Sequence, residues 1–530
     1  MGILNNKQKI GAAAVIMGLS ILLSRFMGLA RDKVISWQFG AGGETDVYFA
    51  AFVVPDFLNY LLAGGYLSIT LIPLLSRLFN NDEEDAWRFF GTVVTWAALS
   101  IGLLSLAAWL AAPWLAPIVA PGFSEEKLVR LTVFLRIILP AQVCFLPGAC
   151  MSAILYIRNE FAVPALTPLV YNGFILLCGI LFPMLGIAGG MEGFCWGVTL
   201  GAFFGSFLLP LMAVRSEGLK WRPGLWHRQM KKFLLLALPL MIGQSVVVLD
   251  EQFIRIFGSL ADEGAVSLLS YARRIMMVPV GVVAQAAGVA SFPFLAGLLA
   301  NGERQVFAET LNKALRNSLI VVFPVVLYMA AVAQPTLGFI FEGGSFSVEK
   351  TDLGAPLLQI MLLAVPFWVL QQIIGRGFYA DQDTVTPAVV GSAATVVCVP
   401  LYLWLTPRFG TPAVASLTVA SVGLYAMALL GWGTRRFGRD IIRNFGRTAF
   451  KSIAVGLPAF GTAWACSRFL LSCSMPNGTG LLLRQFLAIS LGGVAFLIVW
   501  LMTARAFSPE FIAVLLSPFQ KKLGRLLRKG

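Results

Sequence analysis

The stretch Ser24-Arg25-Phe26-Met27-Gly28-Leu29-Ala30-Arg31-Asp32 places three charges inside an otherwise apolar segment. Apolar sequence runs from Ile10 to Leu23 and resumes at Val34, so the charges interrupt a membrane span and do not flank it. Each central charge costs about 2.5–3.5 kcal/mol on insertion scales, and such residues usually face a bundle interior or an aqueous cavity. We therefore expect a polar ligand in a cavity beside this helix.

On an α-helix these polar residues fall on two overlapping faces that share Gly28. Arg25, Gly28 and Asp32 have i, i+3 and i+7 spacing, while Ser24, Gly28 and Arg31 share the neighbouring face. The glycine leaves room for a ligand beside guanidinium groups, which suit phosphate or carboxylate oxygens. The alternative is that Arg31 and Asp32 lie at the water interface and that the Arg25 side chain snorkels to it.

The composition is typical of a polytopic membrane protein. Of the 530 residues 58% are hydrophobic and 12% are charged, and the mean hydropathy is +0.81. The first apolar run exceeds signal-peptide length, so we expect it to stay as the first span. The formal net charge is +14, but the basic residues gather at the ends of apolar segments, which disfavours nucleic acid as a partner.

Few residues suit catalysis or metal binding. The seven cysteines occur singly, without a CxxC motif, and the one histidine, His227, lies in a basic loop. Cys466 and Cys473 could pair on an oxidising side, although free thiols are the simpler expectation. Gly40-Ala-Gly-Gly43 lacks the Lys-Ser/Thr ending of a Walker loop. We predict a transporter and not an enzyme, with no metal site.

The predicted fold class is an all-α polytopic membrane protein with about 14 transmembrane helices of roughly 20 residues or more. The expected spans are 10–37, 46–79, 87–112, 127–156, 161–184, 189–214, 231–258, 265–300, 309–342, 352–380, 385–406, 411–434, 450–471 and 482–505. Internal prolines predict bends, at Pro55, Pro73, Pro140, Pro147, Pro279, Pro293 and Pro366.

The charges of the connections predict the orientation. Connections after odd-numbered spans are acidic or neutral, such as 259–264 and 342–352, whereas 215–232 and 435–451 are rich in Lys and Arg. By the positive-inside rule both termini are cytoplasmic. An even number of spans follows, in agreement with fourteen.

The first twelve helices read as two copies of a six-helix unit. Phe39-Gly40 matches Phe257-Gly258, and the segment from Tyr156 to Pro164-Ala165 matches that from Tyr379 to Pro387-Ala388. Chance similarity between apolar segments is the alternative. Six is an even number, so the copies form a parallel pseudo-two-fold repeat, whose substrate sites usually lie at the repeat interface. The predicted parts are an N-lobe at 1–215, a C-lobe at 229–437, two further helices at 447–506 and a basic cytoplasmic tail at 507–530.

Polar residues recur inside the predicted spans of both copies. Intramembrane arginines in each copy favour an anionic ligand. Arg273 and Arg274 point about 100° apart, so at most one readily faces a central cavity. Glu251 and Arg255 suit an i, i+4 ion pair, and Asp250 is a candidate cation site or an arginine partner. The full set comprises Asp46, Asp56, Asn59, Arg136, Asp250, Glu251, Arg255, Arg273, Arg274 and Arg376.

Several motifs together point to one family. The opening stretch is followed by Phe39-Gly-Ala-Gly42, Thr45-Asp46 and Phe52-Val-Val-Pro55, and later by Tyr271-Ala-Arg-Arg274 and Gly377-Phe-Tyr379. Over nearly its full length the chain closely resembles the MurJ (MviN) lipid II flippases of the MOP transporter superfamily. The resemblance implies two six-helix lobes around a central cavity, with the last two helices forming a groove for a polyprenyl tail.

The resemblance also implies roles for single residues. Arg25, Arg31 and Arg274, with Ser24, correspond to positions associated with the lipid diphosphate headgroup, and Asp46 and Pro164 to other positions that matter for activity. The intramembrane positions add cavity or gating candidates, namely Gly28, Asp32, Asp56, Asn59 and Arg273, and Asp250 as a candidate cation site.

Two positions depart from the family pattern, because Asn59 and Gly64 stand where many members have an arginine and a glutamate. The leading prediction is that the chain flips lipid II to the outer leaflet of the bacterial inner membrane by alternating access. A coupling monovalent cation or the membrane potential would drive it, and membrane lipids and cell-wall synthesis proteins would be further partners. The alternatives are a flippase for another polyprenyl-diphosphate-linked oligosaccharide, an enzyme acting on lipid-linked sugars, and a non-transporting scaffold of the cell-wall machinery.

Overall fold

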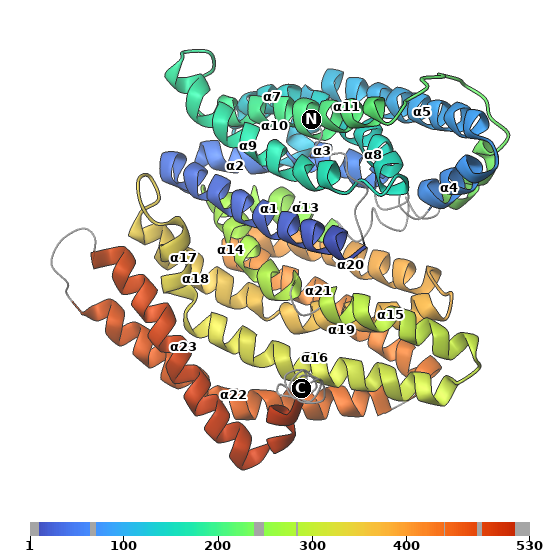
Figure 1. Ribbon diagram of the computed structural model, residues 1–530. Helices are drawn as coiled ribbons and strands as arrows, with labels where there is room; N and C mark the ends of the chain where they lie inside the picture. The colour runs from blue at the N-terminus through green and yellow to red at the C-terminus, as the bar shows by residue number, and fades with distance from the viewer. Residues whose placement is uncertain are drawn as a thin grey trace. The chain divides into compact units, whose positions relative to one another are not determined.

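The computed structural model describes residues 10–63, 70–237, 249–281, 285–438, 440–473 and 480–514. Within these ranges every named element is a helix, which confirms the predicted all-α class (Figure 1). By their internal contacts the residues form two compact units, 1–267 and 268–530. The lobe limits expected from the sequence remain predictions.

The first unit holds the decisive stretch in α1, an unbroken helix of 30 residues. Its helices are α1 Ile10–Phe39, α2 Gly43–Ala50, α3 Val53–Ala63, α4 Ile72–Asn81, α5 Glu83–Leu110, α6 Ala112–Val119, α7 Glu125–Ile138, η2 Leu139–Ala141, α8 Gln142–Ile157, α9 Ala162–Met184, α10 Glu192–Gly201, η3 Ala202–Leu208, α11 Leu209–Ser216 and α13 Leu249–Gly258.

The second unit follows with α14, which begins just before its boundary. Its helices are α14 Ala265–Pro279, α15 Gln285–Ala300, α16 Arg304–Ala331, α17 Ala333–Phe341, α18 Val348–Leu362, α19 Val365–Ala380, α20 Val385–Phe409, α21 Thr411–Phe437, α22 Asp440–Ser472 and α23 Gly480–Phe507.

Ten helical segments in the described ranges are long and apolar enough to cross a membrane. They correspond to predicted spans 3–6 and 9–14, and they make the chain a multi-pass membrane protein. Predicted spans 46–79, 231–258 and 265–300 each contain a segment outside the described residues, at 64–69, 238–248 and 282–284. The total of fourteen is consistent with the ten and stays a prediction.

Two of the expected proline bends are confirmed. Pro140 lies in the 3₁₀ turn η2, which separates α7 from α8, and Pro366 directly follows the break between α18 and α19. Proline has no N–H for the helical ladder and clashes with the preceding turn, so a break is cheapest there.

The internal repeat is visible in the order of the elements. The 28-residue α5 is followed by the eight-residue α6, and the 28-residue α16 by the nine-residue α17. A broken pair comes next in both units, α7–α8 and α18–α19, and then the long helices α9 and α20. This shared order confirms the duplicated unit.

One connection repeats down to its backbone angles. Asn159 and Gln382, at matching positions of the two copies, are the non-glycine residues with positive φ in the described ranges, 62° and 60°. Each is followed by a residue whose N–H bonds back five positions, from Glu160 to Leu155 O at 2.8 Å and from Asp383 to Phe378 O at 2.9 Å. A residue in the left-handed conformation therefore follows both α8 and α19 at the matching position.

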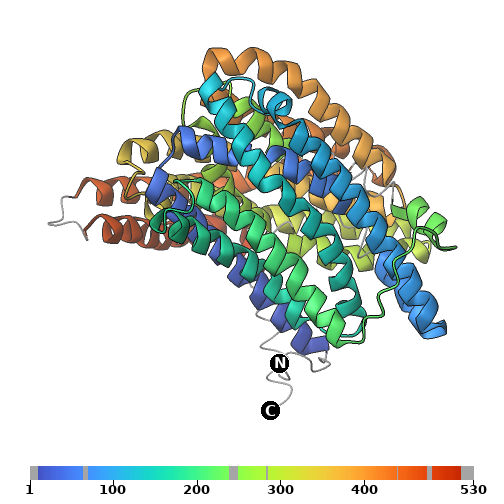
Figure 2. The ribbon, with the colours of Figure 1, turned by 90° about the horizontal axis from the view of Figure 1, so that it is seen from above.

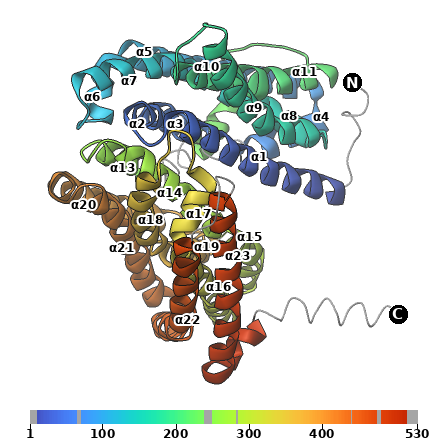
Figure 3. The same ribbon diagram turned by 90° about the vertical axis from the view of Figure 1, so that its left-hand side faces the viewer.

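Close helix packing in the first unit depends on small residues. α10 lies against α9, and a Cβ added at Gly197 would come within 2.6 Å of the Ile175 Cα. Figures 1 and 3 show α1 beside α9. The Ser20 hydroxyl donates a short hydrogen bond to the Ala165 carbonyl, which ties these two helices together.

In the second unit α22 and α23 form a hairpin of two adjacent helices, the red pair in Figures 1 and 2. Val455, Ala459, Phe496 and Trp500 belong to an apolar core that also includes residues of α16. The Tyr328 hydroxyl of α16 donates to the Ile489 carbonyl at 2.9 Å. The hairpin is therefore packed on the rest of its unit and is not a separate domain.

Candidate functional site

The charges of α1 fall into two different environments. Arg31 Nε and Nη2 donate to Asp32 Oδ1 at 3.1 and 2.9 Å, and Nη1 donates to Asn172 Oδ1 of α9 at 3.4 Å. The Arg31 and Asp32 side chains are 13% and 1% exposed. Both side chains are therefore buried on α1, and the Asp32 carboxylate neutralises the Arg31 guanidinium.

Arg25, two turns earlier, is exposed and has no ion pair among the described residues. Gly28 lies between the two arginines, and a Cβ built on it would meet no atom within 4 Å. Ser24, next to Arg25, is half-buried. The open space expected beside Gly28 is therefore present, and Arg25 is the uncompensated charge that faces outward from α1.

Asn172 is a site residue that the sequence did not reveal. Its amide also donates to the Pro168 carbonyl at 2.9 Å, which turns its side-chain oxygen toward Arg31. Pro164, the α9 residue that the resemblance selected, is buried in the first turn of the same helix. An asparagine within an apolar span was the available signal, since such polar residues usually pair inside the bundle.

A second charged cluster joins α3 and α13 within the first unit. Arg255 Nη1 donates to Asp56 Oδ2 at 2.6 Å and Nη2 to Glu251 Oε1 at 2.7 Å. The Glu251–Arg255 ion pair was expected from its spacing and is confirmed. The Asp56 contact was not foreseen, and with it two carboxylates share one guanidinium that is 12% exposed.

Asp46 of α2 caps the first turn of α14. Its carboxylate accepts the Gly264 N–H at 2.6 Å and the Ser267 N–H at 2.8 Å, and its side chain is 1% exposed. A carboxylate at a helix N-terminus meets both unpaired N–H groups and the positive end of the helix dipole. A predicted gating residue is thus a link between segments more than two hundred residues apart.

Further ion pairs surround Asp46 in the first unit. Arg130 of α7 donates to Glu44 at 3.0 Å and also pairs with Glu192. Lys127 Nζ lies 3.1 Å from Glu263, whose other carboxylate oxygen accepts the Gly43 N–H at 2.9 Å. These side chains are partly exposed, so each pair contributes at most about 1 kcal/mol. The Gly43–Glu263 hydrogen bond joins the 43–46 and 263–267 segments in addition to the Asp46 contacts, while the Arg130 and Lys127 pairs hold both segments to α7.

The remaining predicted residues have separate surroundings. Asn59 is half-buried on α3, and in the second unit Arg273 is buried whereas Arg274 is exposed. The two adjacent arginines therefore differ in exposure, and which of them faces a central cavity stays a prediction. Asp250 lies on α13, but its side chain is outside the described residues, as is all of Gly64.

The chemistry available is electrostatic. The guanidinium of Arg31 has five N–H donors, three of which are used, so two can still bind an anion. Arg25 offers all of its donors. Within the described ranges no group of three or more His, Cys, Asp or Glu could hold a metal ion. The arrangement suits binding of an anionic group such as a phosphate.

Comparisons with known proteins agree with this chemistry. A family model described as "Lipid II flippase MurJ" matches residues 35–477. A probable lipid II flippase MurJ of Rhizobium meliloti is 29% identical over 438 residues, which cover 80% of this chain and 81% of that protein. The lipid II flippase MurJ of Burkholderia cenocepacia is 28% identical over 389 residues, covering 71% and 74%.

Solved structures share the fold. A lipid II flippase MurJ in an inward closed conformation superposes with a TM-score of 0.76 at 22% identity, over 94% of this chain and 100% of the other. An inward-facing multidrug-resistance MATE transporter of the MOP superfamily gives a TM-score of 0.63 at 16% identity, over 80% and 98%.

Proposed function

Because the chain belongs to the lipid II flippase MurJ family, we propose that it moves lipid II from the cytoplasmic to the outer leaflet of the bacterial inner membrane. The observation that carries the proposal is the pair of arginines on α1. Arg25 is exposed without an ion-pair partner, and Arg31 keeps two free donors although Asp32 balances its charge. Guanidinium groups are the side chains best suited to diphosphate oxygens.

The proposed mechanism is alternating access. An inward-open state takes the lipid from the cytoplasmic leaflet, and Arg25, Arg31 and Arg274 bind its diphosphate. The contact of Asp46 with the first turn of α14 would close the outer side and would have to open before release. Arg255 is balanced by the carboxylates of Asp56 and Glu251, so this cluster in the first unit supplies no net positive charge for the diphosphate.

We further propose that the membrane potential helps to drive transport. Moving one negative charge outward from a negative interior is favourable by about 2.3 kcal/mol per 100 mV. A monovalent cation coupled at Asp250 is the other proposed energy source. Both termini would be cytoplasmic, and cell-wall synthesis proteins would be partners on that side.

A second candidate is transport of another polyprenyl-diphosphate-linked oligosaccharide. It is favoured by Asn59 and Gly64, which replace an arginine and a glutamate common in the resembling proteins. The diphosphate and the lipid are the same in both candidates, so the α1 arginines would have the same role and only the glycan contacts would differ.

The test is rescue of cells depleted of their own lipid II flippase, with lipid II in the outer leaflet measured directly. We expect the wild-type chain to restore growth and exposure of lipid II, and Arg25→Ala to abolish both at normal expression. Arg408→Ala is the matched control, because Arg408 is an exposed arginine over Trp404 on α20 and outside the proposed site. Failure of the well-inserted wild type would favour the second candidate, whereas full rescue by Arg25→Ala would refute the site.

A further inference from the structure

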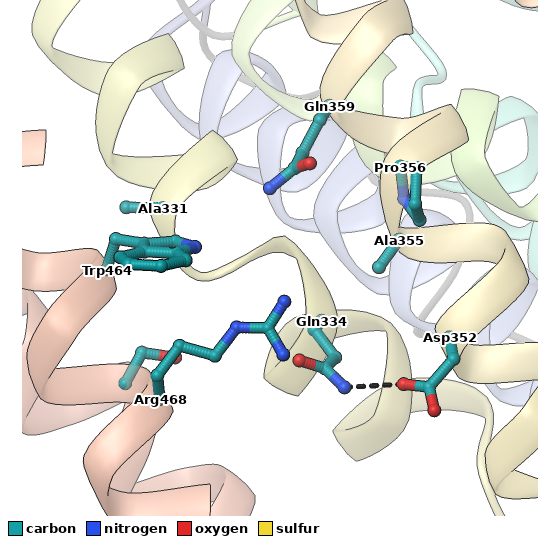
Figure 4. A pocket seen from close by; sticks show the side chains of 9 residues that line it. Ala331, Gln334, Asp352, Ala355, Pro356, Gln359, Trp464 and Arg468 are labelled. Atoms are coloured by element: carbon teal, nitrogen blue, oxygen red, sulfur yellow. Dashed lines mark hydrogen bonds between the residues drawn. The ribbon is translucent and has the colours of Figure 1, made fainter. Parts of the chain in front are cut away.

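A polar cavity of about 220 Å³ lies inside the second unit, and none of its lining residues is assigned above to the substrate. Figure 4 shows its walls, formed by the end of α16, by α17 and α18, and by α22. Alanine and proline side chains keep it open. Its polar lining consists of Gln334, Asp352, Gln359, Ser467 and Arg468, and the indole of Trp464 forms part of one wall.

The cavity contains opposite charges that do not pair with each other. Arg468 extends from α22 toward Gln334 (Figure 4), and its guanidinium lies 5.7 Å from the Trp464 ring centre. Among the described residues Arg468 contacts this ring and Asp352 on α18 contacts Gln334, and neither side chain makes an ion pair. The guanidinium therefore keeps its N–H donors available for an anion.

The opposite wall supplies acceptors. Gln334 Nε2 donates to Asp352 Oδ1 at 2.5 Å, and this amide leaves the carboxylate with unused lone pairs. The Gln334 side-chain oxygen is buried and accepts no hydrogen bond from any described group. Gln359 Nε2 is already directed to the Ala330 carbonyl at 2.9 Å. The Asp352 carboxylate on this wall therefore lacks a cationic partner.

An apolar stripe on α22 leads into the cavity. Ile453, Leu457, Gly461 and Trp464 follow helical spacing that continues to Arg468. The side chains of Ile453, Leu457 and Trp464 are 42%, 57% and 44% exposed, and a Cβ added at Gly461 would meet no atom within 4 Å. On a membrane helix this exposed stripe is available to a lipid chain, and tryptophan and arginine typically mark the level of the headgroups.

We propose that this cavity binds the headgroup of an aminophospholipid, with the phosphate on Arg468 and the ammonium on the Asp352 carboxylate. One acyl chain lies along the stripe from Trp464 to Ile453. An ammonium supplies three N–H donors for the acceptor wall, and a phosphate supplies acceptors for the guanidinium. A headgroup without an amine would leave Asp352 facing an anion.

The site goes beyond the proposed function, because it concerns a lipid that is not transported. Bound there, the lipid contacts α17, α18 and α22 together, so it links the C-terminal hairpin to the remainder of its unit.

Native mass spectrometry of the purified full chain tests the proposal. Phosphatidylethanolamine, phosphatidylcholine and phosphatidylglycerol with identical acyl chains are added separately to delipidated protein. We expect one phosphatidylethanolamine to bind about tenfold more tightly than either of the others, because phosphatidylcholine lacks N–H donors and phosphatidylglycerol lacks the cation. Arg468→Gln and Asp352→Asn should each remove this preference, and Arg468→Lys should keep most of it.

Arg408→Gln is the matched control, since Arg408 lies 4.5 Å from the Trp404 ring on α20 in the same Trp-x-x-x-Arg spacing, outside this cavity. It should leave the preference unchanged. Equal binding of the three lipids, an equal loss in Arg408→Gln, or displacement of the lipid by soluble phosphoethanolamine at the same concentration would each overturn the proposal. Thermal unfolding of every variant identifies those that fail to fold. If Arg468→Gln does not fold, the proposal is tested by Arg468→Lys, which should keep most of the preference for phosphatidylethanolamine.

Discussion

Two arginines six residues apart on α1 differ in what surrounds them. Arg31 is held by Asp32 and Asn172, whereas Arg25 is exposed without an ion-pair partner. Removing one partner of a buried ion pair lowers the stability of a protein by about 3–5 kcal/mol. Removing an exposed charge that has no ion-pair partner changes the stability very little. The two residues should therefore be separable by experiment, although both are proposed to bind the same ligand.

We predict that Arg31→Ala lowers the free energy of unfolding by about 3–5 kcal/mol, because it removes the guanidinium that neutralises the Asp32 carboxylate at 1% exposure. Arg25→Ala should change it by less than about 0.5 kcal/mol. Denaturant unfolding in detergent measures both. The double variant Arg31→Ala/Asp32→Asn should recover much of the loss, and an Arg31→Ala protein as stable as wild type would contradict the ion pair.

Spacing along the chain was enough to predict only one contact of these clusters. Glu251 and Arg255 are four residues apart, so helix geometry brings them together. Arg31 and Asp32 are adjacent and point about 100° apart on a helix, so spacing did not predict their ion pair. The contacts of Arg31 with Asn172 and of Arg255 with Asp56 join residues 141 and 199 positions apart. Their formation depends on how α9 and α13 pack, which no local pattern encodes.

At the scale of elements, residues 217–230, which follow α11 and are called the strap here, lie along the first turns of α5. Asp82 caps α5 by accepting the Glu84 and Asp85 N–H groups. Arg222 pairs with Glu84, and both His227 and Arg228 contact Asp85. The strap was expected from sequence only as a basic loop, since its acidic counterpart lies more than 130 residues earlier.

Gly91 lets this strap approach the helix. A Cβ at this position would lie 2.0 Å from the Arg222 carbonyl oxygen, which cannot move without shifting the backbone. We predict that Gly91→Ala releases the strap and raises the rate of tryptic cleavage after Lys220 and Arg228 several-fold. The control is Gly102→Ala on the same helix, where a Cβ meets no atom within 4 Å and alanine favours the helix by up to about 1 kcal/mol. Unchanged cleavage in Gly91→Ala would refute the close contact.

The repeated turn that ends α19 carries a titrating group outside the spans. Burial alone would raise the pKa of Asp383, but hydrogen bonds from the Thr386 N–H and hydroxyl, with the charge of Arg436, hold it below its ordinary value. A lowered folded-state pKa means stability that is present above the unfolded pKa of about 4 and is lost as the pH falls through the folded value.

We therefore predict that Asp383→Asn is less stable than wild type by about 1–2 kcal/mol between pH 8 and pH 5. The difference should shrink as the pH falls below about 4, because the carboxyl of the unfolded wild type is protonated there and that of the folded protein at still lower pH. Thermal unfolding midpoints across this pH range measure the difference. Asp262→Asn, at an exposed aspartate between α13 and α14, should show no such trend, and a difference for Asp383→Asn that persists to pH 2 would contradict the assignment.

Helices were more predictable than their interruptions. Long apolar runs predicted the ten helices that are long enough to cross a membrane. The restricted geometry of proline predicted the breaks at Pro140 and Pro366. The π-helical turn Ala202–Leu208 was not foreseen. It lies where a Cβ added at Gly205 would come within 2.9 Å of the Tyr171 backbone nitrogen, so close packing against α9 and not local propensity accounts for it.

At the scale of the whole molecule, the number of crossings decides on which side each loop lies. The predicted spans 231–258, 265–300 and 309–342 separate the 217–230 segment from the turn between α17 and α18. Three crossings place the two on opposite sides of the membrane. The abundance of Lys and Arg in the first segment makes it the cytoplasmic one.

Cysteine labelling in spheroplasts tests this orientation. We predict that Ser345→Cys, in the exposed turn after α17, reacts with a membrane-impermeant maleimide in intact spheroplasts. Lys220→Cys should react only after the membrane is permeabilised, because a charged reagent cannot cross the bilayer to the cytoplasmic side. The parent protein, with its seven native cysteines, gives the background label. Labelling of both positions in intact spheroplasts would require an even number of crossings between them. One of the three spans would then not cross, and both the fourteen-helix count and the repeat of six crossings per unit would have to be abandoned.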